Sequence, residues 1–303
     1  MLARISLVAA GALLCAAPQS ACAQDPSATF FPFALDGVYH EIESKYIFGF
    51  TEGADIGAEG ETAVESDTNA AFRKRRGSYN AVEQEVELEG VPTQFFAYEL
   101  SLHGVTNAIK GVDEYDDLHR SGFAGFSTNL RYLLLGRGPE SPIGLTVMAE
   151  PEWARVDGDS GKHTLSLGST FTLMADTELI ENRLFVAGNL FYQPGFAKAV
   201  EDPAWSRAAT MGARGAIAWR FTPTITIGGE AEYYRAYDTL GFGAFQGNAF
   251  YLGPTLHVQL TKKIMLASAF SAQVAGHALG DQLRLDLVNF PRYRARLKLE
   301  YEF

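Results

Sequence analysis

The last eleven residues, Tyr293 to Phe303, constrain the fold more than any other stretch of the chain, and they read YRARLKLEYEF. Alternate positions divide this stretch into an apolar set and a charged set. The apolar set is Tyr293, Ala295, Leu297, Leu299, Tyr301 and Phe303, and the charged set is Arg294, Arg296, Lys298, Glu300 and Glu302. Successive side chains of a β-strand point to opposite faces, so the pattern predicts a strand with one apolar face and one charged face.

The same period of two recurs along the chain, in segments of roughly ten residues that are separated by turn residues. We predict twelve such strands, and ten or fourteen also fit the pattern. They span 41–52, 79–89, 93–104, 123–135, 143–156, 163–178, 184–193, 208–221, 225–237, 250–261, 264–275 and 293–303. Strands of ~9–11 residues with one apolar face are typical of transmembrane β-barrels, which must close because lipid satisfies no open strand edge. The sequence therefore predicts an all-β fold, an antiparallel up-and-down transmembrane barrel.

Composition agrees with strands rather than helices as the membrane-crossing elements. Although 47% of the residues are hydrophobic, no segment after the N-terminus has the ~18 consecutive apolar residues of a membrane helix. The links between segments alternate in length from the fourth strand onward. The short links lie near 137–141, 181–183, 222–224 and 262–263, and the longer ones near 106–121, 194–207, 238–249 and 276–286. Outer-membrane barrels have short periplasmic turns and longer external loops. In the first third of the chain, we expect 53–78 to be a long external loop and 90–92 to be a turn.

The N-terminus has the three parts of a secretory signal peptide. A positive start with Arg4 precedes an apolar stretch over 5–17, and small residues up to Ala23 provide a cleavage site. Cleavage would remove both cysteines, Cys15 and Cys22, which excludes disulfides and thiolate sites in the mature chain. It would also change the formal net charge from −11 to −12, because only Arg4 is lost, and so acidic a chain argues against nucleic acid as a partner. We expect a signal peptide over 1–23, a periplasmic segment over 24–40 and the barrel over 41–303.

The terminal stretch resembles the C-terminal assembly signal of Gram-negative outer-membrane proteins. The residues that carry the likeness are Leu297, Leu299, Tyr301 and Phe303. The resemblance implies that the barrel-assembly machinery reads the last strand through strand pairing and the terminal aromatic. It implies a location in the outer membrane and an insertion route, and no particular activity. The rest of the chain resembles uncharacterised porin-like outer-membrane proteins.

Charged side chains of the inward parity are the candidates for function. The expected pore-lining residues are Glu150, Glu152, Arg214, Arg220, Glu230, Glu232, Arg294, Arg296 and Lys298. Closure of the barrel would place the three bases of the last strand opposite Glu41 and Glu43, and Arg214 and Arg220 opposite Glu230 and Glu232, where opposite charges attract.

This distribution predicts a charged constriction in a channel for passive diffusion of small hydrophilic or charged solutes. The alternative is a non-conducting structural or scaffolding barrel that an ion-pair network fills, because twelve strands lie between the filled lumen of ~8 strands and the open channel of ~16–18.

The one strong basic cluster is Arg73, Lys74, Arg75 and Arg76. It precedes the expected second strand, so it should lie at the external rim and contact lipid headgroups or lipopolysaccharide phosphates. A substrate funnel and a solvated charge run remain alternatives. Outward aromatic residues near strand ends, such as Trp153, Trp219 and Tyr301, are typical of the aromatic girdles at membrane interfaces.

No catalytic or metal-binding arrangement is evident. The six histidines bring no nucleophile, base and orienting group together, so we expect no enzyme, and a lipid-modifying enzyme is the third alternative. The stretch 157–161 (DGDSG) has too few oxygen ligands for a calcium loop and is expected to be a turn. We therefore expect no cofactor and no metal. The expected partners are outer-membrane lipid and lipopolysaccharide, the barrel-assembly machinery and a small hydrophilic solute, and no trimer is predicted.

Overall fold

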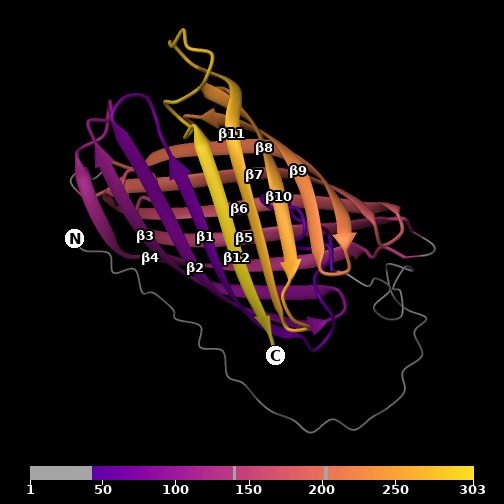
Figure 1. The fold of residues 1–303 in the computed structure, drawn as a ribbon. Helices are drawn as coiled ribbons and strands as arrows, with labels where there is room; N and C mark the ends of the chain where they lie inside the picture. Colours follow the sequence, from indigo (N-terminus) through magenta and orange to yellow (C-terminus); the bar gives the residue numbers. More distant parts are fainter. Residues whose placement is uncertain (1–42, 139–140, 201–203) are drawn as a thin grey trace, which may run out of the picture. The chain divides into compact units, whose positions relative to one another are not determined.

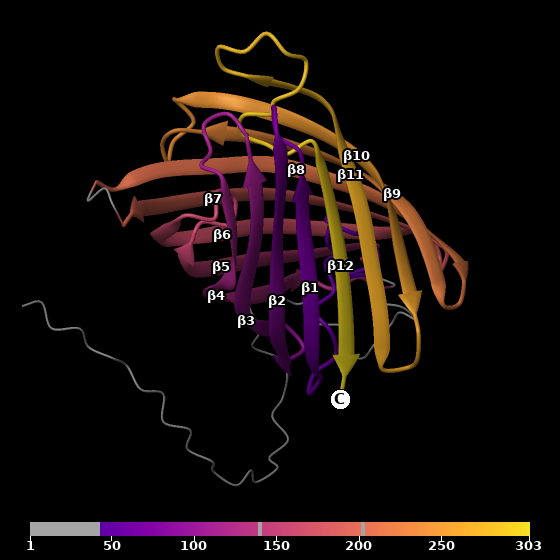
Figure 2. The ribbon, with the colours of Figure 1, turned by 60° about the vertical axis from the view of Figure 1, so that its left-hand side comes forward.

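The computed structural model describes residues 43–138, 141–200 and 204–303, and these form a closed barrel of twelve antiparallel strands (Figure 1). The strands are β1 (Thr62–Phe72), β2 (Ser78–Thr93), β3 (Phe96–Lys110), β4 (Leu118–Leu135), β5 (Ile143–Val156), β6 (His163–Ile180), β7 (Leu184–Ala199), β8 (Ser206–Thr222), β9 (Ile225–Tyr237), β10 (Phe245–Gln259), β11 (Ile264–Ala278) and β12 (Tyr293–Glu302). Each strand pairs with its neighbours in sequence, and β1 pairs with β12 to close the barrel, as Figure 2 shows from a second side. The predicted fold class and strand number are confirmed.

Alternating exposure along the strands gives the barrel an apolar outer face. On β12, Leu297, Leu299 and Tyr301 are 43–47% exposed, whereas Lys298 between them is 3% exposed. The same alternation leaves Leu100, Leu102, Phe126, Phe171, Leu190 and Phe270 on the outside of other strands. So large an exposed apolar surface on a closed barrel is stable only against lipid. The protein is a transmembrane barrel of the Gram-negative outer-membrane type. In the described part of the chain, no helix is long and apolar enough to cross a membrane.

The turns of the barrel differ in length between its two ends. One end carries the short links 94–95, 181–183, 223–224 and 260–263, together with 136–142. The other end carries 73–77, 111–117, 157–162, 200–205, 238–244 and the longest link, 279–292. Since short turns are periplasmic in such barrels, the first end faces the periplasm and the second faces outward. The predicted alternation of link lengths is present from β6 onward, whereas the link 136–142 after β4 is no shorter than the link 157–162 after β5.

The first predicted strand is wrong. Residues 43–52 form turns and bends, and the first strand is β1, which occupies part of the stretch expected to be a long external loop. The outward positions of β1 are Val64, Ser66, Thr68, Ala70 and Phe72, so its outer face is too polar to reveal a strand by alternation. The apolar positions near 46–50 alternate for another reason, because the whole stretch is buried inside the barrel.

Candidate functional site

Residues 43–61, here named the inserted segment, occupy the lumen in the half of the barrel nearer the short turns. From Ser44 to Phe50 every residue is buried. Ile47 and Phe48 are at most 1% exposed and pack against the inward side chains of Phe185, Ala187 and Ala218 on β7 and β8. From Ser44 to Glu52 the segment pairs with no strand, so its backbone polar groups there need other hydrogen-bond partners.

Side chains of the barrel wall supply those partners. The Glu230 carboxylate on β9 accepts hydrogen bonds from the backbone N–H groups of Phe50 and Thr51, both at 2.9 Å. Asn189 on β7 accepts from the N–H of Glu52 and donates to its carbonyl oxygen, both at 2.8 Å. A wall amide thus satisfies both backbone groups of one residue, as a neighbouring strand would.

Basic side chains of the wall hold the segment from the other side. Arg296 donates to the carbonyl oxygen of Gly49 at 2.8 Å, and Arg214 donates to that of Phe50 at 2.9 Å. Arg131 on β4 forms an ion pair with Glu52 at 2.8 Å. Gly49 is required here, because its φ is +100° and a Cβ atom would lie 2.7 Å from Thr255 and 2.9 Å from Glu230.

Below these contacts, Lys45 lies among the acids of the wall. Its Nζ is 2.5 Å from Glu89 and 2.8 Å from Glu99, and its side chain is 1% exposed. Lys298 is 2.5 Å from Glu65, which is also buried. Buried charges persist only when they are paired, so this network ties the inserted segment to β1, β2, β3 and β12.

The inserted segment divides the space inside the barrel into two cavities. The outer cavity has a volume of about 470 Å³ and extends from Phe50 and Glu52 to the external residues Asp159 and Pro291. A second cavity of about 320 Å³ lies at the periplasmic end, beside Glu43 and Arg220. The gap between the segment and the wall of β11 and β12, lined by Tyr46, Gly49, Ala267, Ser268, Arg296 and Lys298, has no room for a water molecule.

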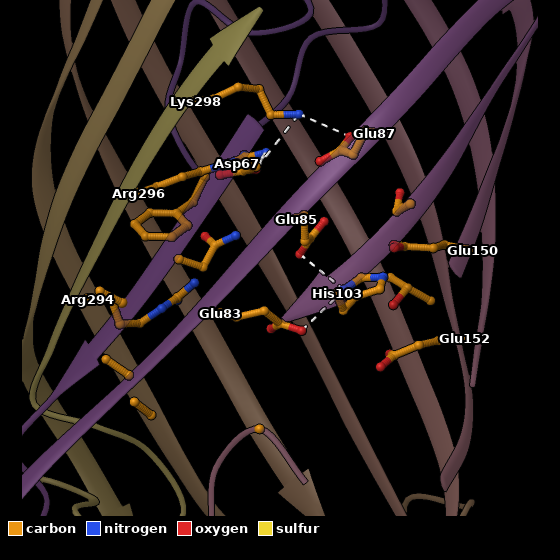
Figure 3. A pocket seen from close by; sticks show the side chains of 18 of the residues that line it. Asp67, Glu83, Glu85, Glu87, His103, Glu150, Glu152, Arg294, Arg296 and Lys298 are labelled. Carbon is orange, nitrogen blue, oxygen red and sulfur yellow. Dashed lines mark hydrogen bonds and ion pairs between the residues drawn. The ribbon is translucent and has the colours of Figure 1, made fainter. Parts of the chain in front are cut away.

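Some acids of the outer cavity pair with its bases, as Asp67 does with Arg296, whereas others lie apart from them (Figure 3). Arg294, Arg296 and Lys298 extend from β12 on one side, and Glu150 and Glu152 extend from β5 on the other. The acids that line the cavity are Glu52, Asp67, Glu83, Glu85, Glu87, Glu99, Glu150, Glu152 and Asp159. The bases are Arg131, Arg214, Arg294, Arg296 and Lys298. Nine acids against five bases leave a formal lining charge of −4 when the histidine is neutral.

The structure places the predicted pore-lining residues in three locations. Glu150, Glu152, Arg214, Arg294, Arg296 and Lys298 line the outer cavity. Glu230 and Glu232 face inward but are buried, at 4% and 0% exposed, against the inserted segment and Arg294. Arg220 lies in the periplasmic cavity, where it donates to the carbonyl oxygen of Pro223.

The expected ion-pair partners of the last strand need correction. Arg294 pairs with Glu232 at 2.9 Å, and Arg296 pairs with Asp67 at 2.7 Å. Lys298 pairs with Glu65 rather than with Glu43. Glu41 lies outside the described residues. The physical reason is the position of β1, whose inward acids take the place expected for the acids of 41–52. The attraction expected between Arg214 and Glu232 is present at 3.9 Å.

Sequence reasoning missed several residues of the lumen. Glu65 and Asp67 were missed because β1 was predicted to be a loop. Lys45 and Glu52 were missed because their segment was predicted to be a strand. The glutamates at 83, 85 and 87 did carry a signal, since they share the inward parity of a predicted strand, as His103 does on the next.

The basic cluster forms the external turn between β1 and β2. Arg73 and Arg76 are exposed at the rim, whereas Lys74 is 4% exposed and points inward. Its Nζ lies 2.7 Å from Asp159 and also bonds the Tyr115 hydroxyl. Burial and the adjoining Asp159 carboxylate raise the pKa of Tyr115 well above its usual value. Lys74 therefore joins external loops, and Arg73 and Arg76 are the members of the cluster that remain exposed at the rim.

Among the described residues, the turn 157–161 and three groups of acidic or histidine side chains bear on metal binding; two of the groups contain Glu65, which pairs with Lys298. The turn 157–161 closes on itself, because the Asp157 carboxylate accepts from the N–H and the hydroxyl of Ser160 at 2.7 and 2.6 Å. Glu83, Glu85 and His103 form a separate group in the outer cavity, with donor atoms that lie within 4.8 Å of one another.

Comparisons with known proteins agree with the fold. The chain is similar to an outer-membrane channel from Pseudomonas putida F1, with a TM-score of 0.53 and 11% identity over 82% of this chain and 98% of that one. It is also similar to the KdgM porin (TM-score 0.45, 12% identity, 80% and 99% covered) and to the NanC porin (0.43, 11%, 79% and 98%). Likeness at these identities concerns the fold alone. No curated protein matches significantly. The model of a family described as a family of unknown function (DUF6662) matches residues 40–303.

Proposed function

The chain belongs to the family of unknown function DUF6662, and we propose that it is a porin-like channel through which small hydrophilic cations diffuse passively. The inserted segment closes this channel, and solutes pass when the segment moves aside. The proposal rests on one observation: the barrel holds a charged outer cavity of about 470 Å³ and a second cavity at its periplasmic end, with the inserted segment between them.

The lining of the outer cavity favours cations over anions. Its formal charge is −4, and Glu150 and Glu152 of β5 lie opposite the bases of β12, so the lumen carries a transverse field as well as a net negative potential. Charge that lines a narrow, low-dielectric passage concentrates ions of opposite sign and repels those of like sign. Glu150 and Glu152 contribute strongly to the negative potential. No ion pair among the described residues includes either carboxylate, so no base neutralises their charge.

Movement of the inserted segment is compatible with the way in which it is held. Hydrogen bonds and ion pairs to the wall hold it, and water could replace each of them once the segment leaves the lumen. The apolar contacts of Ile47 and Phe48 with β7 and β8 oppose this movement. Opening is therefore expected to be infrequent.

A closed structural barrel is the second candidate, and the buried network around Lys45 and Glu65 favours it. A barrel stabilised by so many internal ion pairs would serve as a scaffold without conducting. The geometry supports a lipid-modifying enzyme less well, because the polar side chains lie in the lumen rather than on the lipid-facing surface.

Two macromolecular or lipid partners belong to the same proposal. Arg73 and Arg76 would contact lipopolysaccharide phosphates at the external rim. The strand that ends in Tyr301 and Phe303 would be read by the barrel-assembly machinery. Its last N–H, that of Phe303, donates to the carbonyl oxygen of Thr62 at 3.0 Å, so the proposed signal lies at the closure of the barrel.

Planar-bilayer recording in a salt gradient tests the channel. Stepwise conductance with a reversal potential on the cation-selective side supports the proposal. Folded barrel, recognised by heat-modifiable mobility in gels, that gives no steps would favour the scaffold, and an anion-selective potential would contradict the reading of the lining.

A further inference from the structure

His103 on β3 lies beside two glutamates of the adjacent strand β2, and its register partner is Glu85 (Figure 3). Its Nδ1 lies 3.2 Å from a carboxylate oxygen of Glu83 and 3.7 Å from one of Glu85. The imidazole is 5% exposed and the Glu85 side chain 18% exposed, whereas the Glu83 side chain is 37% exposed at the cavity. The nearest bases of the cavity, such as Lys298, pair with acids farther along the barrel.

The other nitrogen of the ring fixes its tautomer. Ser127 donates its hydroxyl hydrogen to Glu150 at 3.1 Å, so its oxygen is left to accept from His103 Nε2 at 3.0 Å. A neutral imidazole with hydrogen on Nε2 has a lone pair on Nδ1. That lone pair points at two carboxylates, which is repulsive unless a positive charge lies between them.

A metal ion fits this position. Two donors bound to one zinc ion at about 2.0–2.1 Å with tetrahedral geometry lie roughly 3.3 Å apart. The 3.2 Å from His103 Nδ1 to Glu83 matches this separation, and the 3.7 Å to Glu85 requires the Glu85 carboxylate to move closer. Metal-binding histidines commonly donate their second N–H to an outer partner that orients the ring, and the chain through Ser127 to Glu150 has that form.

A second observation points to a ligand in the same place. Asn129 lines the cavity and is 6% exposed, and its side-chain oxygen has no hydrogen-bond partner. The strand registers set Asn129 between Glu150 of β5 and Glu99 of β3, one inward position along β4 from Ser127, which contacts His103. An unpaired oxygen buried among carboxylates is available to a cation or to its water ligands.

We propose that Glu83, Glu85 and His103 bind a divalent transition-metal cation of the zinc type in the outer cavity. Imidazole with carboxylates suits zinc and its neighbours rather than calcium or magnesium, which prefer oxygen alone. Three protein ligands leave a coordination position that faces the cavity. Binding does not require the channel to conduct, because the cavity extends to the external loops.

Equilibrium dialysis of the refolded, full-length barrel against Zn²⁺ tests the site. We expect one ion per barrel, and a loss of affinity of at least tenfold in His103→Gln and in Glu85→Gln. Ser127→Ala should weaken binding by about 10–100-fold, as for other outer partners of metal ligands. His119→Gln is the matched control, because His119 is exposed on β4 and should bind Zn²⁺ as the parent does.

Heat-modifiable mobility identifies variants that fail to fold, and the Co²⁺ absorption spectrum of the parent barrel provides a measurement that needs no variant. A Co²⁺ band with nitrogen and oxygen ligands supports the proposal. Two results would overturn it. One is Ca²⁺ binding as tight as that of Zn²⁺ with no effect of His103→Gln, which would mean an unspecific acidic patch. The other is the absence of bound Zn²⁺, which would mean that a proton on His103 Nδ1, and not a metal ion, lies between the imidazole and the two carboxylates.

Discussion

Replacing Glu230 with alanine should release the inserted segment. One oxygen of this carboxylate accepts the backbone N–H groups of Phe50 and Thr51 at 2.9 Å each. Each buried donor left without a partner costs roughly 1–3 kcal/mol. The two together should therefore destabilise the seated segment by about 2–6 kcal/mol, which raises the population of the displaced state ~30-fold or more.

A single cysteine makes this population measurable. The only cysteines of the sequence, Cys15 and Cys22, lie in the predicted signal peptide, so Thr51→Cys would give the mature barrel one thiol. Thr51 is 0% exposed, so maleimide reacts only when the segment leaves its place. We expect the rate of labelling to rise ~30-fold or more when Glu230→Ala is added to this background.

Two controls make the result specific. In Glu230→Gln, the amide oxygen can keep both hydrogen bonds, and its nitrogen can take the place of the oxygen that has no partner. The labelling rate should then rise much less than in the alanine variant. Glu152→Ala removes a lumen glutamate that does not touch the segment, and it should leave the rate unchanged. Equal rates in the parent and in Glu230→Ala would refute the role given to these hydrogen bonds.

Three further predictions concern the lumen and the assembly route. Gly49→Ala places a Cβ at φ +100° and against Thr255, which should cost about 1–3 kcal/mol and raise labelling at position 51 about fivefold or more; unchanged labelling would mean that the segment is not packed there. Glu150→Gln with Glu152→Gln changes the formal charge of the lining from −4 to −2, so the reversal potential should move toward zero, and a shift toward stronger cation preference would contradict the proposed field. Removing Phe303, whose side chain is 64% exposed, should slow insertion in cells while refolding in detergent stays normal; normal insertion in cells would argue against the assembly signal.

The strands that face lipid could be predicted because lipid demands apolar residues at every second position. Leu297, Leu299 and Tyr301 show this on β12, and their exposure in the structure follows from the same alternation. The charged face of β12 was equally visible, since a lumen accepts arginine and lysine where lipid does not. Both inferences need only one strand and its two surroundings.

The inserted segment could not be predicted in this way. Its side chains meet the inner wall on all sides, so Tyr46, Phe48 and Phe50 produced an alternation that had no lipid as its cause. The opposite error occurred at β1. This strand does face lipid, but Ser66 and Thr68 stand at its outward positions, so no apolar alternation revealed it. The partners of the last strand depend on which segment closes the barrel, so the error in β1 also assigned Arg296 and Lys298 to the wrong acids.

The central claim is that the inserted segment closes a channel, and a reversible covalent link tests it most directly. A Cβ built on Gly144 of β5 would lie 3.0 Å from that of Ala54 and 2.6 Å from the Asp176 carboxylate. A small shift of the segment away from the wall and of the Asp176 side chain brings the two Cβ atoms to the separation of about 3.5–4.5 Å in disulfides. The double variant Ala54→Cys, Gly144→Cys would therefore fasten the segment to the wall. We predict no step conductance from the oxidised barrel in planar bilayers, and cation-selective steps after reduction of the same sample. Equal conductance in both states would contradict the account, because solutes would then pass without movement of the segment.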